Sequence, residues 1–182
     1  MEELDPLSLR SMTLTSWSLY QMRDYQESMA KAQQIIDLDP TNFQGHLQIG
    51  NGLLEVGEIE RALAELREAF RLVPTSLSAC YLCFALAAAG LRAEAERVHA
   101  DMIATGTKEY FLALAHVALG DYDEALICLE KAGAERDPWL VWFGTEAKLD
   151  PLRADPRFIK IFRSTNNPLA FQETANPFAT RR

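Results

Sequence analysis

Apolar residues recur at steps of three and four positions over most of the chain. The clearest stretch contains Leu47, Ile49, Leu53, Leu54, Ile59, Ala62, Leu63, Leu66, Ala69 and Phe70. This spacing is typical of amphipathic helices, whereas a half-buried strand would alternate with a period of two. The sequence shows no such alternation, so the pattern predicts an all-helical protein.

The helical pattern repeats along the chain. Leu-Asp-Pro at 4–6 returns at 38–40 and again as Leu-Val-Pro at 72–74, which gives two intervals of 34 residues. Each unit is divided by a turn residue, and the four turn residues are Arg23, Gly57, Gly90 and Gly120. Glycine readily adopts the left-handed backbone that ends a helix. Each unit is therefore predicted to be a pair of antiparallel helices.

Small residues stand where the two helices of a unit would meet. The second unit has Gly50 and Ala62, the first has Ser16 and Ser28, and the fourth has Ala113 and Ala125. Helices approach closely only where side chains are short. With the turn glycines and the terminal prolines, this pattern resembles the tetratricopeptide repeat over about residues 8–136. The resemblance implies an all-α, right-handed superhelical solenoid of helix-turn-helix units closed by short C-terminal helices.

The chain divides into segments on this basis. Four repeats are expected at about 8–41, 42–75, 76–105 and 106–136. Residues 1–7 match the end of a preceding repeat, so the chain is expected to be a fragment of a longer repeat protein or to begin with a truncated repeat. Capping helices are predicted over 137–163, and an irregular tail over 164–182.

Three Asp-Pro pairs, at 137/138, 150/151 and 155/156, each predict the start of a short helix. Aspartate accepts hydrogen bonds at a helix start, and proline suits the first helical position. The apolar residues of this segment are expected to cover the last repeat. The segment resembles the closing part of bacterial tetratricopeptide proteins attached to signalling modules, which implies a regulatory part of a larger bacterial protein.

Composition narrows the range of partners. The chain has 182 residues, with 18 Lys and Arg against 26 Asp and Glu, a net charge of −8. Without a run of basic residues, neither nucleic acid nor a membrane surface is favoured as a partner. No apolar run reaches the length of a membrane span. Three cysteines fit a reducing compartment, so a cytoplasmic location is expected.

No residue pattern indicates catalysis. Cys80 and Cys83 have redox-motif spacing but lie within a predicted helix, and no second pair completes a zinc site. His46, His99 and His116 belong to three different units and lack paired metal-ligand spacing. Buried packing is the preferred interpretation of all these residues. The sequence therefore predicts a non-enzymatic protein with no cofactor and no metal site.

The resemblance places a partner-binding groove on the first helices of the units, which line the concave face in this family. The corresponding residues are Arg10, Thr13, Trp17, Tyr20, Gln44, Leu47, Gln48, Asn51, Tyr81, Phe84, Tyr110 and Leu114. These aromatic and amide side chains favour a partner protein's extended or helical peptide, with the amides pairing its backbone. Two alternatives remain open: the aromatics pack between helices or under the terminal helices, or the chain self-associates through exposed terminal helices.

Overall fold

The computed structural model describes residues 8–165. The predicted remnant of a repeat at 1–7 lies outside the described residues, as does the predicted tail of 164–182 from residue 166 onward; Ser164, predicted to begin that tail, is instead the last residue of α9. The helices of this range are α1 (Leu9–Gln21), α2 (Tyr25–Leu38), α3 (Phe43–Glu55), α4 (Ile59–Leu72), α5 (Ser76–Ala88), α6 (Arg92–Ala104), α7 (Glu109–Leu119), α8 (Tyr122–Ala134), the 3-10 helices η1 (Pro138–Trp142) and η2 (Ala147–Leu152), and α9 (Pro156–Ser164).

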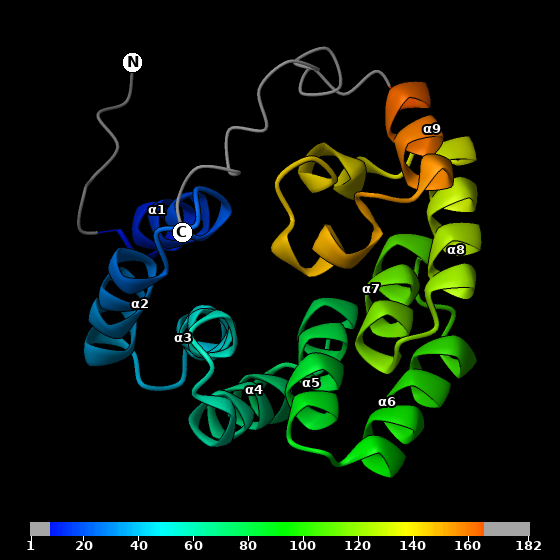
Figure 1. Ribbon diagram of the computed structural model, residues 1–182. Helices are drawn as coiled ribbons and strands as arrows, with labels where there is room; N and C mark the ends of the chain where they lie inside the picture. Colours follow the sequence, from blue (N-terminus) through cyan, green and yellow to red (C-terminus); the bar gives the residue numbers. More distant parts are fainter. Residues whose placement is uncertain (1–7, 166–182) are drawn as a thin grey trace.

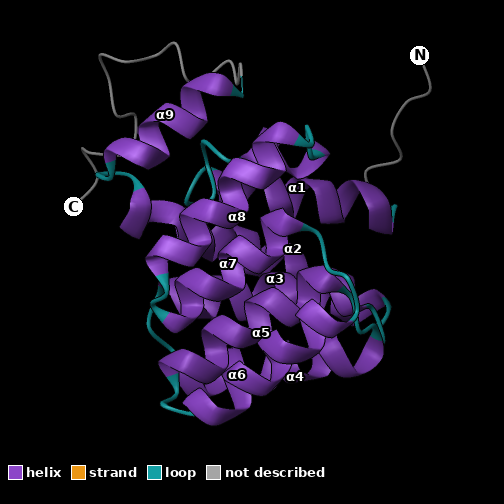
Figure 2. Ribbon diagram, turned by 90° about the vertical axis from the view of Figure 1, so that its right-hand side faces the viewer, coloured by secondary structure: helices purple, strands orange, loops and turns teal. Residues whose placement is uncertain are grey.

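Consecutive helices pack as pairs and the pairs stack into an arc. In Figure 1, α1, α3, α5 and α7 line the inside of the arc, and α2, α4, α6 and α8 lie outside. Figure 2 shows the stack from the side, with no strand in the part of the chain that is described. The predicted all-helical solenoid is confirmed.

The turns between paired helices have the backbone that the sequence predicts. Gly57, Gly90 and Gly120 have φ angles of 82°, 75° and 81°. The first turn has the same left-handed backbone at Arg23, with φ 63°. A side chain at such a position is strained, since its Cβ crowds the following carbonyl. The first repeat thus has a strained arginine at the position where the other three repeats have an unstrained glycine.

Small residues bring the paired helices close together. A Cβ added at Gly50 on α3 would lie 2.5 Å from Cγ of Leu66 on α4. In the first repeat, the Ser16 hydroxyl donates to the Ser28 carbonyl at 2.9 Å, and the Ser28 hydroxyl donates to the Ser16 carbonyl at 2.8 Å. These exchanged hydrogen bonds satisfy the hydroxyls at a seam too narrow for longer side chains.

The segment after α8 folds as short helices, with one start in a different place from the prediction. Asp137 caps η1 and Asp155 caps α9, as expected. The helix start predicted at Asp150 and Pro151 is wrong, because η2 begins at Ala147, four residues before Pro151. The carboxylate of Glu146 caps η2 by accepting from the Lys148 amide at 3.1 Å. Pro151 consequently lies inside η2 rather than at its start.

Candidate functional site

The inside of the arc is occupied by the chain's own residues 137–153, here called the clasp. Figure 1 shows this segment between α1 on one side and α7 on the other. Trp139 packs edge-on against Phe111 of α7 with ring centroids 4.9 Å apart. At the other side, Trp142 packs edge-on against Trp17 of α1, with centroids 5.7 Å apart. The clasp therefore covers the last repeat, as expected, and also reaches the first.

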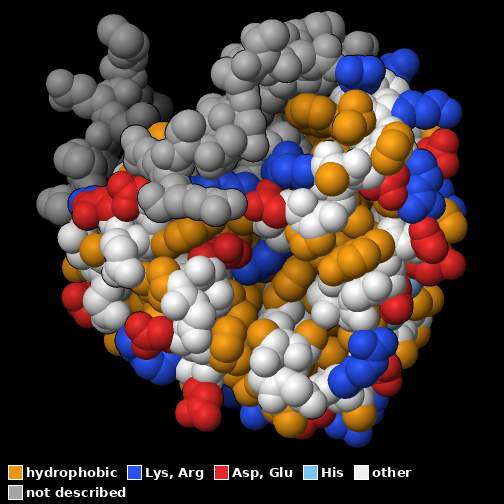
Figure 3. Space-filling view, in the orientation of Figure 1, with side chains coloured by type: hydrophobic (Ala, Val, Ile, Leu, Met, Phe, Trp, Pro, Cys, Tyr) orange, Lys and Arg blue, Asp and Glu red, His pale blue; other side chains and the backbone are white. Residues whose placement is uncertain are grey.

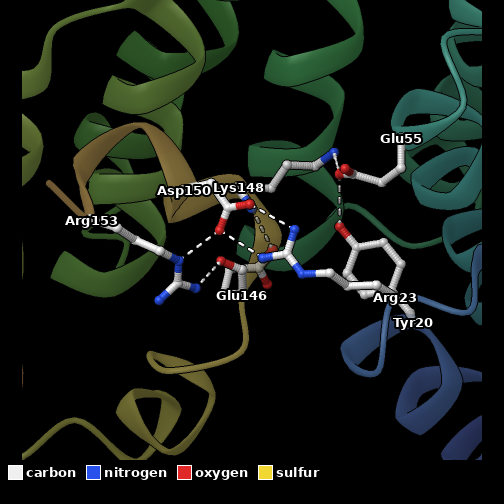
Figure 4. A network of polar contacts seen from close by, with 7 residues as sticks. All are labelled: Tyr20, Arg23, Glu55, Glu146, Lys148, Asp150 and Arg153. Carbon is white, nitrogen blue, oxygen red and sulfur yellow. Dashed lines mark hydrogen bonds and ion pairs between the residues drawn. The ribbon is translucent and has the colours of Figure 1, made fainter. Parts of the chain in front are cut away.

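Polar contacts join the clasp to the first two repeats (Figure 4). The Arg23 guanidinium donates to both carboxylate oxygens of Asp150, each at 2.7 Å. The ammonium of Lys148 contacts the carboxylate of Glu55 at the end of α3. The same Glu55 oxygen accepts from the Tyr20 hydroxyl at 3.2 Å. In Figure 3 charged side chains of both signs lie at the centre of this face, with hydrophobic ones around them.

Burial sets the electrostatics of the clasp. Glu146 is only 1% exposed and accepts from the Tyr81 hydroxyl at 2.8 Å. Burial raises the pKa of this carboxyl, although the Lys148 amide and the Tyr81 hydroxyl act in the opposite direction. For Asp150, burial alone would raise the pKa, but hydrogen bonds from Arg23 and Arg153 outweigh it and lower the pKa. Asp150 thus remains a carboxylate that is able to hold Arg23.

The structure places the predicted groove residues in three environments. The buried ones are Tyr20, Leu47, Gln48, Asn51, Tyr81, Tyr110 and Leu114. Thr13, Trp17, Gln44 and Phe84 are partly exposed, and Arg10 is exposed. Tyr110 and Leu114 belong to the main core. Phe84 lies beneath the clasp, with the Lys148 ammonium 5.3 Å from its ring centroid.

Five of the predicted residues meet in one cavity, here called the Trp17 slot. Its lining consists of Thr13, Leu14, Trp17, Gln44, Leu47, Gln48, Leu77, Trp139 and Trp142, around a volume of about 200 Å³. A larger cavity of about 750 Å³ lies beside it, at the ends of α4 and α6 and the starts of α5 and α7. Leu77 and Trp139 line both cavities, so the two share a wall.

Several buried amides on α1 and α3 have no hydrogen-bond partner among the described residues. The unpaired atoms are the side-chain nitrogen and oxygen of Gln21, the side-chain nitrogen and oxygen of Asn51, and the side-chain oxygen of Gln48. Each of these side chains is at most 5% exposed. An unpaired buried amide is destabilising. These amides therefore retain unused hydrogen-bonding capacity inside the solenoid.

The other candidate side chains form no reactive cluster in the described residues. Cys80, Cys83 and Cys128 are buried free thiols. His46 contacts the Glu65 carboxylate at 2.7 Å and the Pro40 carbonyl at 3.0 Å. Within residues 8–165 no group of three or more His, Cys, Asp or Glu side chains could hold a metal ion.

The sequence did not single out Arg23, Glu146, Lys148 and Asp150 as residues of the concave face. One signal was available for Arg23, because it occupies the turn position at which the other repeats have glycine. No comparable signal marks the clasp residues. Their contacts with the turn after α1 and with α3 span 127 and 93 positions of sequence, beyond any local pattern.

The stacked helix pairs and the lined concave face define a helical-repeat protein. The family model described as tetratricopeptide repeat matches residues 110–132, within α7 and α8. This match, together with the stacked helix pairs, supports a tetratricopeptide repeat protein. No curated protein matches it significantly. No helix of the described range is long and apolar enough to cross a membrane.

Proposed function

We propose that this protein is a non-catalytic scaffold that binds a partner protein through a peptide held on its concave face. Tetratricopeptide repeats generally mediate protein–protein interaction. We extend the proposal to a regulatory role within a larger cytoplasmic protein of a bacterium, as expected from the sequence of the C-terminal segment. The predicted groove residues of the first two repeats contribute the binding surface. Those of the last two repeats pack in the core behind this surface.

The Trp17 slot carries this proposal. Its volume of about 200 Å³ is below the range of roughly 300–1,000 Å³ that is common for small-molecule sites. It suits one large apolar side chain of a peptide, which is the usual anchor of a protein interface. Leu14, at its edge, is 56% exposed and therefore accessible to a partner. The larger cavity across Leu77 and Trp139 offers room for a second apolar side chain.

A peptide-display screen with matched surface variants tests this proposal. Peptides selected on the wild-type chain are rebound to Leu14→Glu and to Ile127→Glu. Ile127 is a suitable control because it is 45% exposed and lies on the outer helix α8. We expect Leu14→Glu to lose binding and Ile127→Glu to keep it. If the selected peptides bind both variants with the affinity they have for wild type, the slot is excluded as their binding site.

Self-association is the second candidate, and the exposure of Leu14 beside Trp17 favours it. Exposed Leu14, next to the partly exposed Trp17 at the end of the arc, could meet the same surface of another copy. Sedimentation of the wild-type chain over a wide concentration range tests this. A dimer that Leu14→Glu dissociates and Ile127→Glu leaves intact would assign the surface to self-association instead of a partner peptide.

A further inference from the structure

The clasp is held on its two sides by contacts of different kinds. On the side of the fourth repeat it is apolar: η2 packs against α7, and Phe143 and Leu149 are fully buried in the main core. On the side of the first two repeats it is held by the pairs Arg23–Asp150 and Lys148–Glu55, and by the ring contact of Trp142 with Trp17. The clasp is thus anchored in the core on one side, and on the other it is fastened by two exchangeable ion pairs and one aromatic contact.

Two of the buried amides share a helix face with a residue that contacts the clasp. Gln48, Asn51 and Glu55 are spaced by three and four residues, so they share one face of α3. Glu55 on this face contacts the clasp, which directs the face toward it. Gln48 lines the Trp17 slot together with Trp139 and Trp142 of the clasp, and neither its side-chain oxygen nor the amide atoms of Asn51 have a hydrogen-bond partner among the described residues. An extended peptide has backbone N–H and C=O groups that can pair with such amides.

We propose that the η2 part of the clasp is a displaceable occupant of the concave face, and that the partner replaces it with a segment carrying a basic residue followed two positions later by an acidic one, while Trp139 and Trp142 continue to line the Trp17 slot. This inference rests on the proposed function. Lys148 and Asp150 have this spacing, and they satisfy the opposite charges of Glu55 and Arg23. A partner segment with the same two charges gains both ion pairs and the unpaired amides, so it can compete with the clasp.

A peptide copy of the clasp tests this directly. The probe is a synthetic peptide of residues 137–153 with an N-terminal fluorophore, titrated with the full chain by fluorescence anisotropy. The variant chain carries Lys148→Met and Asp150→Asn, which weakens its own clasp and leaves Arg23 and Glu55 in place. We expect the probe to bind this variant about tenfold tighter than wild type, because the tethered clasp otherwise competes at about millimolar effective concentration.

Two controls define the expected specificity. Arg157→Ala removes ion pairs with Asp123 and Asp155, outside the clasp, and should leave probe binding as in wild type. A second probe has the residues at positions 148 and 150 exchanged, and it should bind the clasp variant no more tightly than it binds wild type. Equal affinity of the original probe for wild type and variant, or an equal gain by the exchanged probe, would overturn the proposal.

A second variant covers the case in which the double substitution unfolds the chain. Arg23→Gly introduces the residue found at the three equivalent turns and removes one fastening contact. The amides of η2 should then exchange faster with solvent, and unchanged exchange would overturn the proposal. A wild-type dimer that dissociates when Lys148 and Asp150 are replaced would also overturn it, because the groove would then hold another copy's clasp.

The two proposals fail in different ways. If the probe gains affinity for the clasp variant but Leu14→Glu does not affect selected peptides, only the slot is excluded. If Leu14→Glu abolishes peptide binding but the probe gains nothing, only the displaceable clasp is excluded.

Discussion

Arg23 and Asp150 form a two-pronged ion pair across 127 positions of sequence, with both nitrogen–oxygen distances at 2.7 Å. The arginine has left-handed backbone at φ 63°, which costs a non-glycine residue about 1–2 kcal/mol. The side chains of the pair are 25% and 39% exposed, and exposed pairs contribute about 0–1 kcal/mol. Arg23 therefore adds little net stability, and its main effect is to hold the clasp against the first repeat.

Replacing Arg23 by glycine should hardly change global stability. The lost ion pair and the relieved backbone strain offset each other, so we expect the unfolding free energy to change by less than about 1 kcal/mol. Arg23→Ala loses the pair but keeps the strain, and should be less stable than Arg23→Gly by about 1 kcal/mol. Urea denaturation of both variants measures this. Equal stability of the two would contradict the strain assigned to this turn.

Gly50 should not tolerate a side chain. The added Cβ would lie 2.5 Å from Leu66 Cγ and 3.3 Å from the Ala62 carbonyl oxygen, so Gly50→Ala should cost about 1–3 kcal/mol by overpacking. Gly133 on α8 is the control, because a Cβ added there would lie 4.0 Å from its nearest neighbour, the Cγ2 atom of Ile161. Gly133→Ala should stabilise the helix by about 0.5–1 kcal/mol. Thermal unfolding compares them, and a stabilised Gly50→Ala would contradict the close helix seam.

Stability should fall below neutral pH because of His99 and His116. Their rings lie 4.3 Å apart, and burial lowers the pKa of both, with His116 adding to the effect on His99. The unfolded chain binds these protons near pH 6.5, whereas the folded chain binds them only at lower pH. Stability is thus complete above about pH 6.5 and declines as the pH falls below it.

Unfolding free energies between pH 7.5 and pH 5 measure this effect. The double variant His99→Gln with His116→Gln should have a shallower decline than wild type. An identical slope in the two proteins would show that other groups cause the decline.

The three thiols should be inert in the folded protein. Burial raises the pKa of Cys83 and of Cys128 to about 12, and that of Cys80 well above its ordinary value. The thiolate is the reactive form, so a chromogenic disulfide reagent at pH 8 should modify none of them until the chain unfolds. Rapid modification of the folded chain would contradict this packing.

The sequence predicted the solenoid well because its signals are local and repeated. Gly57, Gly90 and Gly120 marked the turns, and Gly50 marked a close helix contact. The occupied concave face was not predictable in the same way. Lys148 and Asp150 meet partners that are far away in sequence, and the conformation of η2 depends on Glu146, whose carboxylate is held by Tyr81.

Hydrogen exchange of the clasp during peptide binding tests the central claim most directly. The full chain is labelled with ¹⁵N and saturated with the unlabelled 137–153 peptide, so that only the chain's own clasp is observed. In the free chain the Lys148 and Leu149 amides donate to Glu146, and they should be protected. On saturation we expect both amides to lose protection while those of α4 keep it. Clasp amides that remain protected at saturation would contradict a displaceable clasp.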